Sequence, residues 1–386
     1  MNRRLRGVNS MTNIEDLRQR ARRRLPRTIF DFVDGGSQDE LSLRANRTDF
    51  QKLAFRPRVL TDVSMRDQTT TVLGETLTSP LIIAPTGLAG VLRRDGEALE
   101  ARAAANAGIA YCLSMMSACS IEQVARATSR PFWFQVYLLR DRGINVRLIE
   151  RARAVGCRVL VLTVDTKAQG PRERDIRNGF TVPPRVTARN ALDFARRFGW
   201  LTDVALGPRI TFGNLAGSLV GSDDIISVAR FAAEQYDPSI NWSDLEWCKS
   251  NWHGPVAVKG VLTTQDARLA IEHGADAVIV SNHGGRQLDG SPSAISMLPM
   301  IAEVCTGRAE VILDGGIRRG SDVLKALALG ARACMAGRPF LYGLAADGEA
   351  GVTRAIDILR TEIDVDLALL GRGCARQLDA SALAWM

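Results

Sequence analysis

A histidine and an arginine stand three residues apart in the run SNHGGRQLD at 281–289, directly after the apolar stretch 277–280. An imidazole that accepts a proton beside a guanidinium that binds a carboxylate is a typical proton-transfer centre. The glycines between them let a ligand approach the backbone closely. A single histidine is more often a surface or structural residue, so the interpretation depends on its neighbours. With these neighbours, we interpret His283 as a general base and Arg286 as a carboxylate ligand.

Two later loops combine glycine with arginine. The run DGGIRRGS at 314–321 follows the apolar stretch 310–313. The run AGRP at 336–339 stands at the end of the next apolar stretch along the chain. Glycine N–H groups, the start of a helix and arginine side chains all favour the binding of phosphate. Barrels of this type commonly bind phosphate after their last two strands. We expect the helix here to begin with Ser321 and Asp322 as its cap. Two ordinary tight loops with solvated arginines are the alternative. No GxGxxG motif follows a predicted strand, so a nicotinamide dinucleotide site is not expected.

Other predicted strands also end in polar side chains. Lys259 follows the apolar stretch 256–258 and would be costly to bury without a negative partner, so we expect a bound anionic group, such as a reduced flavin, beside it. The remaining strand-end residues, each weak as an indication by itself, are Thr86, Gly87, Ser114, Gln135, Tyr137, Thr163 and Asp165.

The elements that must position these residues repeat along the chain. An alanine-rich helix end, a glycine and a short apolar strand recur at 105–113, 154–164, 272–281 and 328–336. Further strands are predicted at 81–84, 132–137, 256–259 and 310–314. Strands that alternate with helices form a parallel sheet, and eight such units favour closure into a (β/α)8 TIM barrel of the α/β class. A doubly wound open sheet is the alternative.

We predict a single domain over 1–386. Residues 1–80, with a helix at about 13–24 and a turn at 34–36, would form a helical cap across one barrel end. Residues 81–345 would form the barrel, and 346–386 C-terminal helices. A basic and aromatic insert at about 166–247 interrupts the barrel after strand 4, and such an excursion is typical of a lid or an interaction loop.

The composition favours some classes of function and excludes others. The net charge of +8 favours an anionic partner, which can be a nucleic acid, an anionic membrane surface or a small acid. No apolar run approaches the roughly 20 residues of a membrane span, and the N-terminus lacks the apolar core of a secretory signal, so we expect a cytoplasmic protein. The seven cysteines form no CxxC or CxxH pair, and no HExxH or GxSxG motif occurs. We therefore expect no metal site and no hydrolase chemistry.

Taken together, these segments resemble the FMN-dependent α-hydroxy acid dehydrogenase and oxidase family, which includes lactate dehydrogenases, glycolate oxidases and mandelate dehydrogenases. The resemblance covers nearly the whole chain, and its motifs are LP at 25–26, DGG at 34–36, APTGL at 84–88, WFQVY at 133–137, TVDT at 163–166, RERD at 172–175, VKG at 258–260, SNHGGRQLDG at 281–290 and DGGIRRG at 314–320. The segment YDPSINW at 236–242 and the basic insert are most similar to the membrane-associated, quinone-linked bacterial L-lactate dehydrogenases.

The resemblance implies roles for individual residues. His283 would remove a proton from an L-2-hydroxy acid, Asp165 would stabilise the imidazolium, and Tyr137 would bind the substrate oxygen. Arg286 and Arg172 would bind the substrate carboxylate. The flavin ring of FMN would be surrounded by Thr86, Gly87, Ser114, Gln135, Thr163, Lys259 and Ser281. The ribityl and phosphate groups would be held by Asp314, Gly315, Gly316, Arg318, Gly337 and Arg338.

The implied product is a 2-oxo acid, with electrons passed to a quinone or another non-oxygen acceptor. The implied assembly is a homo-oligomer, a tetramer by resemblance, located in the cytoplasm or peripherally on the inner face of the cell membrane, with no nucleic-acid partner. Two residues depart from the family pattern: Phe32 stands where a tyrosine usually helps bind the carboxylate, and Met116 where glycolate oxidases carry tryptophan.

Three alternatives stay open at this point. An oxygen-using oxidase would produce hydrogen peroxide, and oxidases tend to carry alanine where this chain has Gly87. An FMN barrel isomerase would keep the phosphate loops but would have no use for His283 and Arg286. A non-catalytic anion-binding barrel would explain the charge and leave His283, Asp165 and Tyr137 unexplained.

Overall fold

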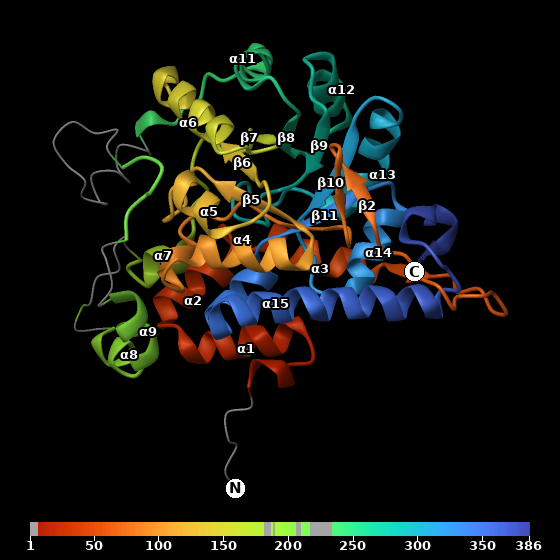
Figure 1. The fold of residues 1–386 in the computed structure, drawn as a ribbon, viewed down its shortest axis with the longest axis horizontal. Coiled ribbons are helices and arrows are strands. Elements are labelled where there is room, and N and C mark those ends of the chain that lie inside the picture. The colour runs from red at the N-terminus through yellow and green to blue at the C-terminus, as the bar shows by residue number, and fades with distance from the viewer. Residues whose placement is uncertain (1–6, 181–186, 188–189, 206–209, 217–233) are drawn as a thin grey trace, which may run out of the picture.

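Eight parallel strands close into a barrel in the computed structural model, which describes residues 7–180, 187, 190–205, 210–216 and 234–386 (Figure 1). In barrel order from the first strand along the chain they are β4 (Leu81–Ile83), β5 (Ala110–Ser114), β6 (Trp133–Val136), β7 (Leu160–Thr163), β8 (Val256–Val261), β9 (Ala277–Val280), β10 (Glu310–Asp314) and β11 (Ala333–Ala336). The predicted barrel is therefore confirmed, and the open sheet is excluded by the pairing of β11 with β4.

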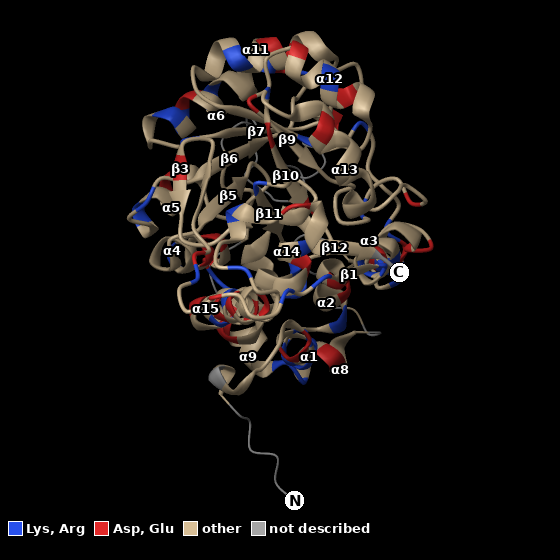
Figure 2. Cartoon of the chain, turned by 90° about the vertical axis from the view of Figure 1, so that its right-hand side faces the viewer, with Lys and Arg blue, Asp and Glu red and all other residues tan. Residues whose placement is uncertain are grey.

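Helices surround the barrel because each crossover packs its apolar face on the strands. They are α4 (Gly96–Ala107), α5 (Ile121–Ala127), α6 (Arg142–Ala154), α11 (Trp242–Trp252), α12 (Thr264–Glu272), α13 (Ala294–Cys305), α14 (Gly320–Ala328) and α15 (Arg338–Leu369). The last of these is kinked at Asp347 and Gly348. In Figure 2 most charged residues lie on these outer helices, while the barrel strands are mostly uncharged.

The N-terminal region contributes to both ends of the barrel. It forms α1 (Ile14–Arg24), α2 (Arg27–Asp34) and α3 (Leu41–Gln51), then the hairpin β2 (Thr70–Val72) and β3 (Glu75–Leu77). Val72 and Leu77 pack with the residues that begin the barrel strands, and Glu75 accepts a hydrogen bond from Trp133 Nε1 at 3.0 Å. Helix α2 instead reaches the ends of the strands. The predicted helices before the barrel are confirmed, and the hairpin between 70 and 77, which was not predicted, packs at the opposite end of the strands from α2.

Short elements complete the description. They are the turns η1 (Val8–Ser10), η2 (Ala89–Val91), η4 (Ala375–Gln377) and η5 (Ala380–Ala382), and the strands β1 (Leu53–Phe55) and β12 (Leu383–Trp385), which pair antiparallel. The described part of the insert contains α7 (Glu173–Arg177), α8 (Ala191–Ala195), α9 (Phe198–Trp200) and the π-turn η3 (Leu201–Ala205). None of the helices in the described ranges is long and apolar enough to cross a membrane.

The described part of the insert is fastened to the barrel loops. Trp200 Nε1 donates to Val91 O at 2.8 Å. Asn214, which is buried, donates to Ser117 Oγ at 2.9 Å and accepts from Ile121 N at 2.8 Å. The insert is therefore joined to the loops that follow β4 and β5. The remainder of the predicted lid or interaction loop lies outside the described residues.

The start of α14 differs from the expected cap. The helix begins at Gly320 with Arg319 as its N-cap, and Ser321 caps nothing. Asp322 accepts from Arg318 N at 2.8 Å and from Arg319 N at 3.0 Å. The Asp322 carboxylate, in the first turn of the helix, thus accepts both of these N–H groups, and the Ser321 hydroxyl is not needed as a cap.

Two buried glutamates lie one turn apart on α4. Glu97 accepts from Ala118 N at 2.8 Å, whereas neither carboxyl oxygen of Glu100 has a hydrogen-bond partner in the described part of the chain. Burial raises the pKa of Glu100 well above its ordinary value, and the charge of Glu97 raises it further. Glu100 is therefore held as a neutral acid in the folded chain.

We expect Glu100→Gln to raise the thermal stability of the protein at alkaline pH. The folded chain keeps the Glu100 proton where the unfolded chain has released it, so the free energy of unfolding falls as the pH rises above 4.5 toward the raised pKa. The loss is about 1.4 kcal/mol for each pKa unit crossed. Thermal unfolding of both proteins at about pH 5 and about pH 8 measures this. A melting-temperature difference that does not grow with pH would contradict it.

Candidate active site

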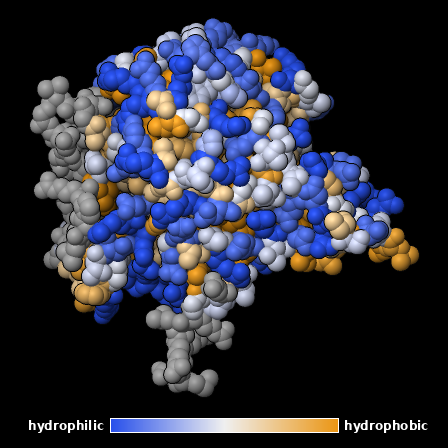
Figure 3. All heavy atoms as spheres, viewed as in Figure 1, coloured by the Kyte–Doolittle hydropathy of each residue, from blue (hydrophilic) through white to orange (hydrophobic). Residues whose placement is uncertain are grey.

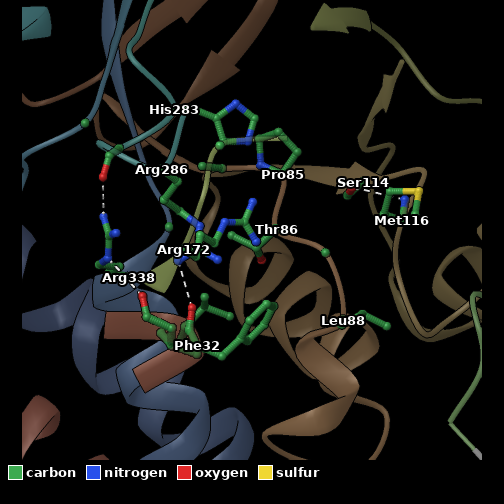
Figure 4. Close-up of a pocket in the computed structure, with 18 of the residues that line it drawn as sticks. Phe32, Pro85, Thr86, Leu88, Ser114, Met116, Arg172, His283, Arg286 and Arg338 are labelled. Carbon is green, nitrogen blue, oxygen red and sulfur yellow. Dashed lines mark hydrogen bonds between the residues drawn. The ribbon is translucent and has the colours of Figure 1, made fainter. Parts of the chain in front are cut away.

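A cavity of about 670 Å³ opens at the carboxyl ends of the barrel strands (Figure 4). The predicted site residues that line it are Thr86, Gly87, Ser114, Tyr137, Arg172, Lys259, His283, Arg286, Asp314, Gly315, Gly316, Arg318, Gly337 and Arg338. Four others, Gln135, Thr163, Asp165 and Ser281, lie directly behind this lining. The structure thus gathers residues from all eight strand ends, although they are far apart in sequence.

His283 and Asp165 form a hydrogen-bonded pair. His283 Nδ1 lies 2.9 Å from Asp165 Oδ1. Burial by itself would raise the pKa of Asp165, but the charge and hydrogen bond of His283 and the charge of Lys259 outweigh it and lower that pKa. An ionised Asp165 fixes the proton of His283 on Nδ1, which leaves Nε2 as the proton acceptor. The pair therefore has the arrangement of a general base and the carboxylate that orients it.

Gly260 makes room for this pair. Its φ is +110°, and a Cβ placed on it would lie 2.7 Å from Asp165 Cγ. Real side-chain atoms do not approach so closely, and a residue with a Cβ would also be strained at this φ. Glycine at position 260 is thus required to keep Asp165 in place under His283.

Three arginines gather on one side of the cavity, as Figure 4 shows for Arg172, Arg286 and Arg338. Burial lowers the pKa of Arg286 well below its ordinary value, and the charges of Arg172 and Arg338 lower it further. Burial also lowers the pKa of Arg172. Arg172 Nε has no partner among the residues described. An anion bound here would relieve this repulsion and satisfy the free donor, so the cavity favours an anionic ligand.

Backbone carbonyls hold Arg286 in position. Its Nη1 donates to Phe32 O at 2.7 Å and to Gly35 O at 3.0 Å. Its guanidinium carbon lies 5.2 Å from the centre of the Phe32 ring. The Phe32 ring itself lines the cavity and stacks on Phe180 with ring centres 4.4 Å apart. Phe32 therefore faces the space in which an acid would bind, and it brings no hydroxyl to it.

Tyr137 has an aromatic partner that sequence reasoning did not identify as a site residue. Tyr236, from the segment after the insert, lines the same cavity and meets Tyr137 edge to face with ring centres 5.4 Å apart. Burial raises the pKa of both phenols, so both stay protonated hydrogen-bond donors. The segment 236–242 had been recognised only as a family motif, and the antiparallel bridge between Leu139 and Tyr236 that places it was not predictable.

The negative partner of Lys259 is a protein side chain. Lys259 Nζ lies 2.7 Å from Asp314 Oδ2 and donates to Ser281 Oγ at 3.1 Å, and Ser281 Oγ donates to Asp314 Oδ2 at 2.7 Å. Burial alone would lower the pKa of Lys259, but Asp314 and Asp165 outweigh it and raise that pKa. Asp314, which ends the strand two places away in the barrel, is thus a negative partner that was not predicted, and the anionic group expected beside Lys259 stays a prediction. Lys259 stays cationic at the cavity floor.

The glycine and arginine loops after β10 and β11 form a further part of the lining, and Arg338 reaches from them to the other two arginines (Figure 4). Gly316 has φ +84°, and a Cβ on it would lie 2.1 Å from Asn46 O, so only glycine fits between the loop and α3. The Arg318 guanidinium lies 5.7 Å from the ring centre of Tyr342. Arg338 donates to the carbonyls of Val33, Gly284 and Gly35 at 2.8–2.9 Å. Arg338 therefore also joins α2 to the His283 loop, in addition to lining the cavity.

Asp34 supports this part of the lining and was not predicted as a site residue. It accepts from Tyr342 Oη at 2.7 Å and from Arg18 Nε at 2.6 Å. Burial would raise the pKa of Asp34, but the hydrogen bonds from Arg18 and Tyr342 outweigh it and lower it to about 2. The DGG run at 34–36 marked this position, but only as a turn.

The hydrogen-bonding groups around the cavity suit a flavin nucleotide. Gln135 Nε2 and Thr163 Oγ1 are buried and have no hydrogen-bond partner among the described residues. Gln135 Oε1 is already occupied by Ser114 Oγ at 3.0 Å. The free groups lie beside the cationic Lys259, as a planar ring with polar edges would require, while the glycines and Arg318 lie where a phosphate was predicted. The residues present therefore suit FMN.

Comparison with known proteins agrees with this geometry. Residues 21–385 match the model of a family described as FMN-dependent dehydrogenase. An L-lactate dehydrogenase of Caulobacter vibrioides is 44% identical over 375 residues, which are 97% of this chain and 98% of that protein. An L-lactate dehydrogenase of Haemophilus influenzae is 43% identical over 377 residues, 97% of this chain and 98% of its own.

Solved structures of similar fold carry the same barrel. A monotopic membrane protein, (S)-mandelate dehydrogenase, superposes with a TM-score of 0.94 at 39% identity and covers 98% of this chain and 100% of its own. A soluble mutant of the membrane-associated (S)-mandelate dehydrogenase from Pseudomonas putida gives a TM-score of 0.86 at 39% identity over the same shares of both chains. A mandelate oxidase variant with (S)-mandelic acid gives 0.83 at 34% identity, with 98% of this chain and 99% of that one covered.

Proposed function

The chain belongs to the FMN-dependent dehydrogenase family, and from this premise we propose that it oxidises a lactate-like L-2-hydroxy acid to the 2-oxo acid and passes the electrons to a quinone or another non-oxygen acceptor. The protein is an FMN-dependent oxidoreductase, a homologue of L-lactate dehydrogenases, that acts on 2-hydroxy acids. The single observation that carries the proposal is the His283–Asp165 pair beside three half-buried arginines that line the cavity.

Bound FMN supplies the two-electron acceptor for this oxidation. The protein side chains bind and orient the acid. Arg286 and Arg172 receive its carboxylate, which their buried and mutually repelling charges favour. The protonated phenol of Tyr137 donates a hydrogen bond to a substrate oxygen.

His283 Nε2 then accepts a proton from the bound acid. Asp165 stabilises the imidazolium that results, because its ionised carboxylate lies 2.9 Å from Nδ1. Lys259, held cationic by Asp314, would stabilise negative charge at the edge of the bound cofactor.

The test of the function is whether the purified yellow protein bleaches on addition of L-lactate under anaerobic conditions, and whether denaturation releases FMN. Bleaching by an L-2-hydroxy acid supports the proposal. No bleaching by any of a series of L-2-hydroxy acids, with FMN present, would exclude it.

An oxygen-using oxidase is the second candidate function, because mandelate oxidases share this fold. By the family resemblance Gly87 favours the dehydrogenase, because oxidases tend to carry alanine at this position, and Gly87 lines the cavity. Reoxidation of the bleached protein by a soluble quinone and by oxygen, measured side by side, distinguishes the two functions.

We also propose peripheral binding to an anionic membrane through the basic and aromatic insert, about Arg174 to Ala216. Ile176, Leu192 and Phe198 are 72%, 63% and 71% exposed in its described part, beside several arginines. The described part of the insert has ion pairs that reduce the predicted basic surface: Arg174 pairs with Glu40, Arg177 with Glu173 and Arg197 with Asp193. A soluble lid over the cavity is the alternative.

We expect the protein to co-sediment with anionic liposomes at low salt and to be released at high salt, since each arginine near such a surface contributes about 1 kcal/mol that salt screens. Phe198→Asp should weaken this binding, while Met300→Asp, at an exposed position on α13, should not. Absence of binding at every ionic strength would favour the lid.

Position 32 gives a prediction about affinity. Because the Phe32 ring lines the cavity beside Arg286, Phe32→Tyr should place a hydroxyl near the substrate carboxylate. A hydrogen bond to a charged group contributes about 1.5 to 3 kcal/mol, so the KM for L-lactate should fall by roughly tenfold or more with a smaller effect on the rate of bleaching. Stopped-flow measurement with L-lactate and with larger L-2-hydroxy acids tests this. An unchanged KM across the series would show that residue 32 does not contact the acid.

A further inference from the structure

One hydroxyl group at the cavity has no part in the reaction as described so far. It belongs to Tyr236, which is half-buried and lines the cavity, and its Oη has no hydrogen-bond partner among the described residues. Figure 3 shows an outer surface that is mostly hydrophilic in that view, and such surface is where polar groups usually meet water. A phenol that lines a cavity is instead placed to donate a hydrogen bond to a ligand.

The main chain holds Tyr236 against the loop that follows β6. Tyr236 forms an antiparallel bridge with Leu139. Arg140 N donates to Gln235 O at 2.8 Å, and Arg140 Nε donates to Tyr236 O at 3.3 Å. The Tyr236 ring also rests edge to face on the Tyr137 ring, with ring centres 5.4 Å apart. The phenol is therefore in position before an acid binds, which lowers the entropic cost of a contact with it.

Tyr236 lies near the guanidinium of Arg172. Burial raises the pKa of Tyr236, and the charge of Arg172 only partly offsets this, so the phenol keeps its proton and can donate it to a hydrogen bond. Arg172 Nε also lacks a partner in the described part of the chain. A carboxylate that binds to Arg172 would therefore meet a second, neutral donor at Tyr236.

The cavity has no hydroxyl at position 32, where the family pattern has a tyrosine. Phe32 brings only an apolar ring to the cavity, beside Arg286. A carboxylate has about four lone-pair sites that accept hydrogen bonds, so two guanidinium groups and a hydroxyl can bind it together. Tyr137 and Tyr236 are the only phenols among the described residues that line the cavity, and the proposed reaction uses Tyr137 for a different substrate oxygen. Tyr236 is thus the phenol that is left for the carboxylate.

We propose that Tyr236 is a further substrate-binding residue, whose Oη donates a hydrogen bond to the substrate carboxylate beside Arg172 and supplies the hydroxyl that Phe32 lacks. This role rests on the proposed function, because the ligand is the L-2-hydroxy acid named there. One donor to the carboxylate then comes from the segment that follows the insert and not from helix α2. Affinity for the acid thereby depends on how the chain returns from the insert to the barrel.

Tyr236→Phe in the FMN-loaded full chain tests the proposal, because it removes the hydroxyl and keeps the ring. Two measurements are made: the KM for L-lactate, and the affinity for propionate, which keeps the carboxylate and lacks the 2-hydroxyl, from the change it causes in the flavin absorbance. We expect both affinities to fall by about tenfold or more, as for the loss of a hydrogen bond to a charged group, with a smaller change in the limiting rate of flavin reduction. Tyr111→Phe is the matched control, since Tyr111 is buried and is not among the residues that line the cavity, and it should bind both acids as the wild type does.

Two results would overturn the proposal. If Tyr236→Phe binds both acids normally and only Tyr236→Leu binds them weakly, Tyr236 serves to pack against Tyr137 and its hydroxyl has no role. If Tyr236→Phe weakens the binding of L-lactate but not of propionate, the hydroxyl contacts the 2-hydroxyl and not the carboxylate. Propionate binding needs no turnover, so a tenfold loss of propionate affinity supports the carboxylate contact even in a protein whose flavin no L-2-hydroxy acid reduces, a result that would exclude the proposed function alone.

Discussion

Replacing His283 with alanine is expected to slow the reduction of the flavin by L-lactate by about 10² to 10⁴ while the protein stays yellow. Asp165, whose Oδ1 lies 2.9 Å from His283 Nδ1, orients the imidazole so that Nε2 is left to accept the proton. Without the imidazole, Asp165 remains packed beside Gly260. There its carboxylate is placed to orient a base and not to accept the substrate proton itself. FMN retention should be unaffected, since the His283 imidazole bonds to Asp165, whereas the predicted phosphate ligands are the glycines and arginines after β10 and β11.

Anaerobic stopped-flow absorbance measures this rate directly. His273→Ala is the matched control, because His273 is not among the residues that line the cavity and its Nδ1 lies 2.7 Å from Glu246 Oε1. That control should reduce as the wild type does. A near-normal rate in His283→Ala would mean that the base is a different residue.

Arg286→Lys is expected to lower kcat/KM for L-lactate by about tenfold to a hundredfold, although the charge is kept. The guanidinium uses one nitrogen to bind the Phe32 and Gly35 carbonyls, and its other N–H groups have no partner among the described residues and can bind a carboxylate. A lysine ammonium cannot hold two carbonyls and a bidentate carboxylate from one nitrogen. The substrate should therefore bind more weakly and in a poorer orientation.

Steady-state kinetics with a fixed artificial acceptor measures this loss, and Arg126→Lys on the exposed side of α5 serves as the control. An unchanged kcat/KM in Arg286→Lys would show that the carboxylate does not bind at this wall. A loss of FMN in the same variant would instead indicate that Arg286 holds the cofactor pocket together.

Local sequence patterns were sufficient to predict the barrel. Each strand was marked by a short apolar run, and four of the eight also by a helix-ending glycine before it. Parallel strands place their ends at one face, so His283, Lys259 and Asp314 could be expected in one site before any coordinates were known. The residues that line the cavity largely follow from that rule.

Contacts between distant loops could not be predicted in the same way. Tyr236 enters the site through a bridge to Leu139 across the insert, and Asp34 through a side-chain hydrogen bond to Tyr342. Neither contact leaves a periodic signal in the sequence. The Lys259–Asp314 ion pair was missed for a related reason, because the pairing depends on which strand ends lie next to each other across the closed barrel. The N-terminal hairpin packs where the barrel strands begin, whereas α2 lies where they end. This placement also depends on tertiary packing and could not be predicted from the sequence.

The way Arg286 is held has an evolutionary consequence. Its anchors are the main-chain carbonyls of Phe32 and Gly35, which every amino acid at those positions would supply. The side chain at position 32 can therefore mutate while the carboxylate clamp keeps its geometry. Substrate preference can drift by single substitutions at this one position without an intermediate that has lost the clamp, so the enzyme can explore new acids along a path on which each step remains active.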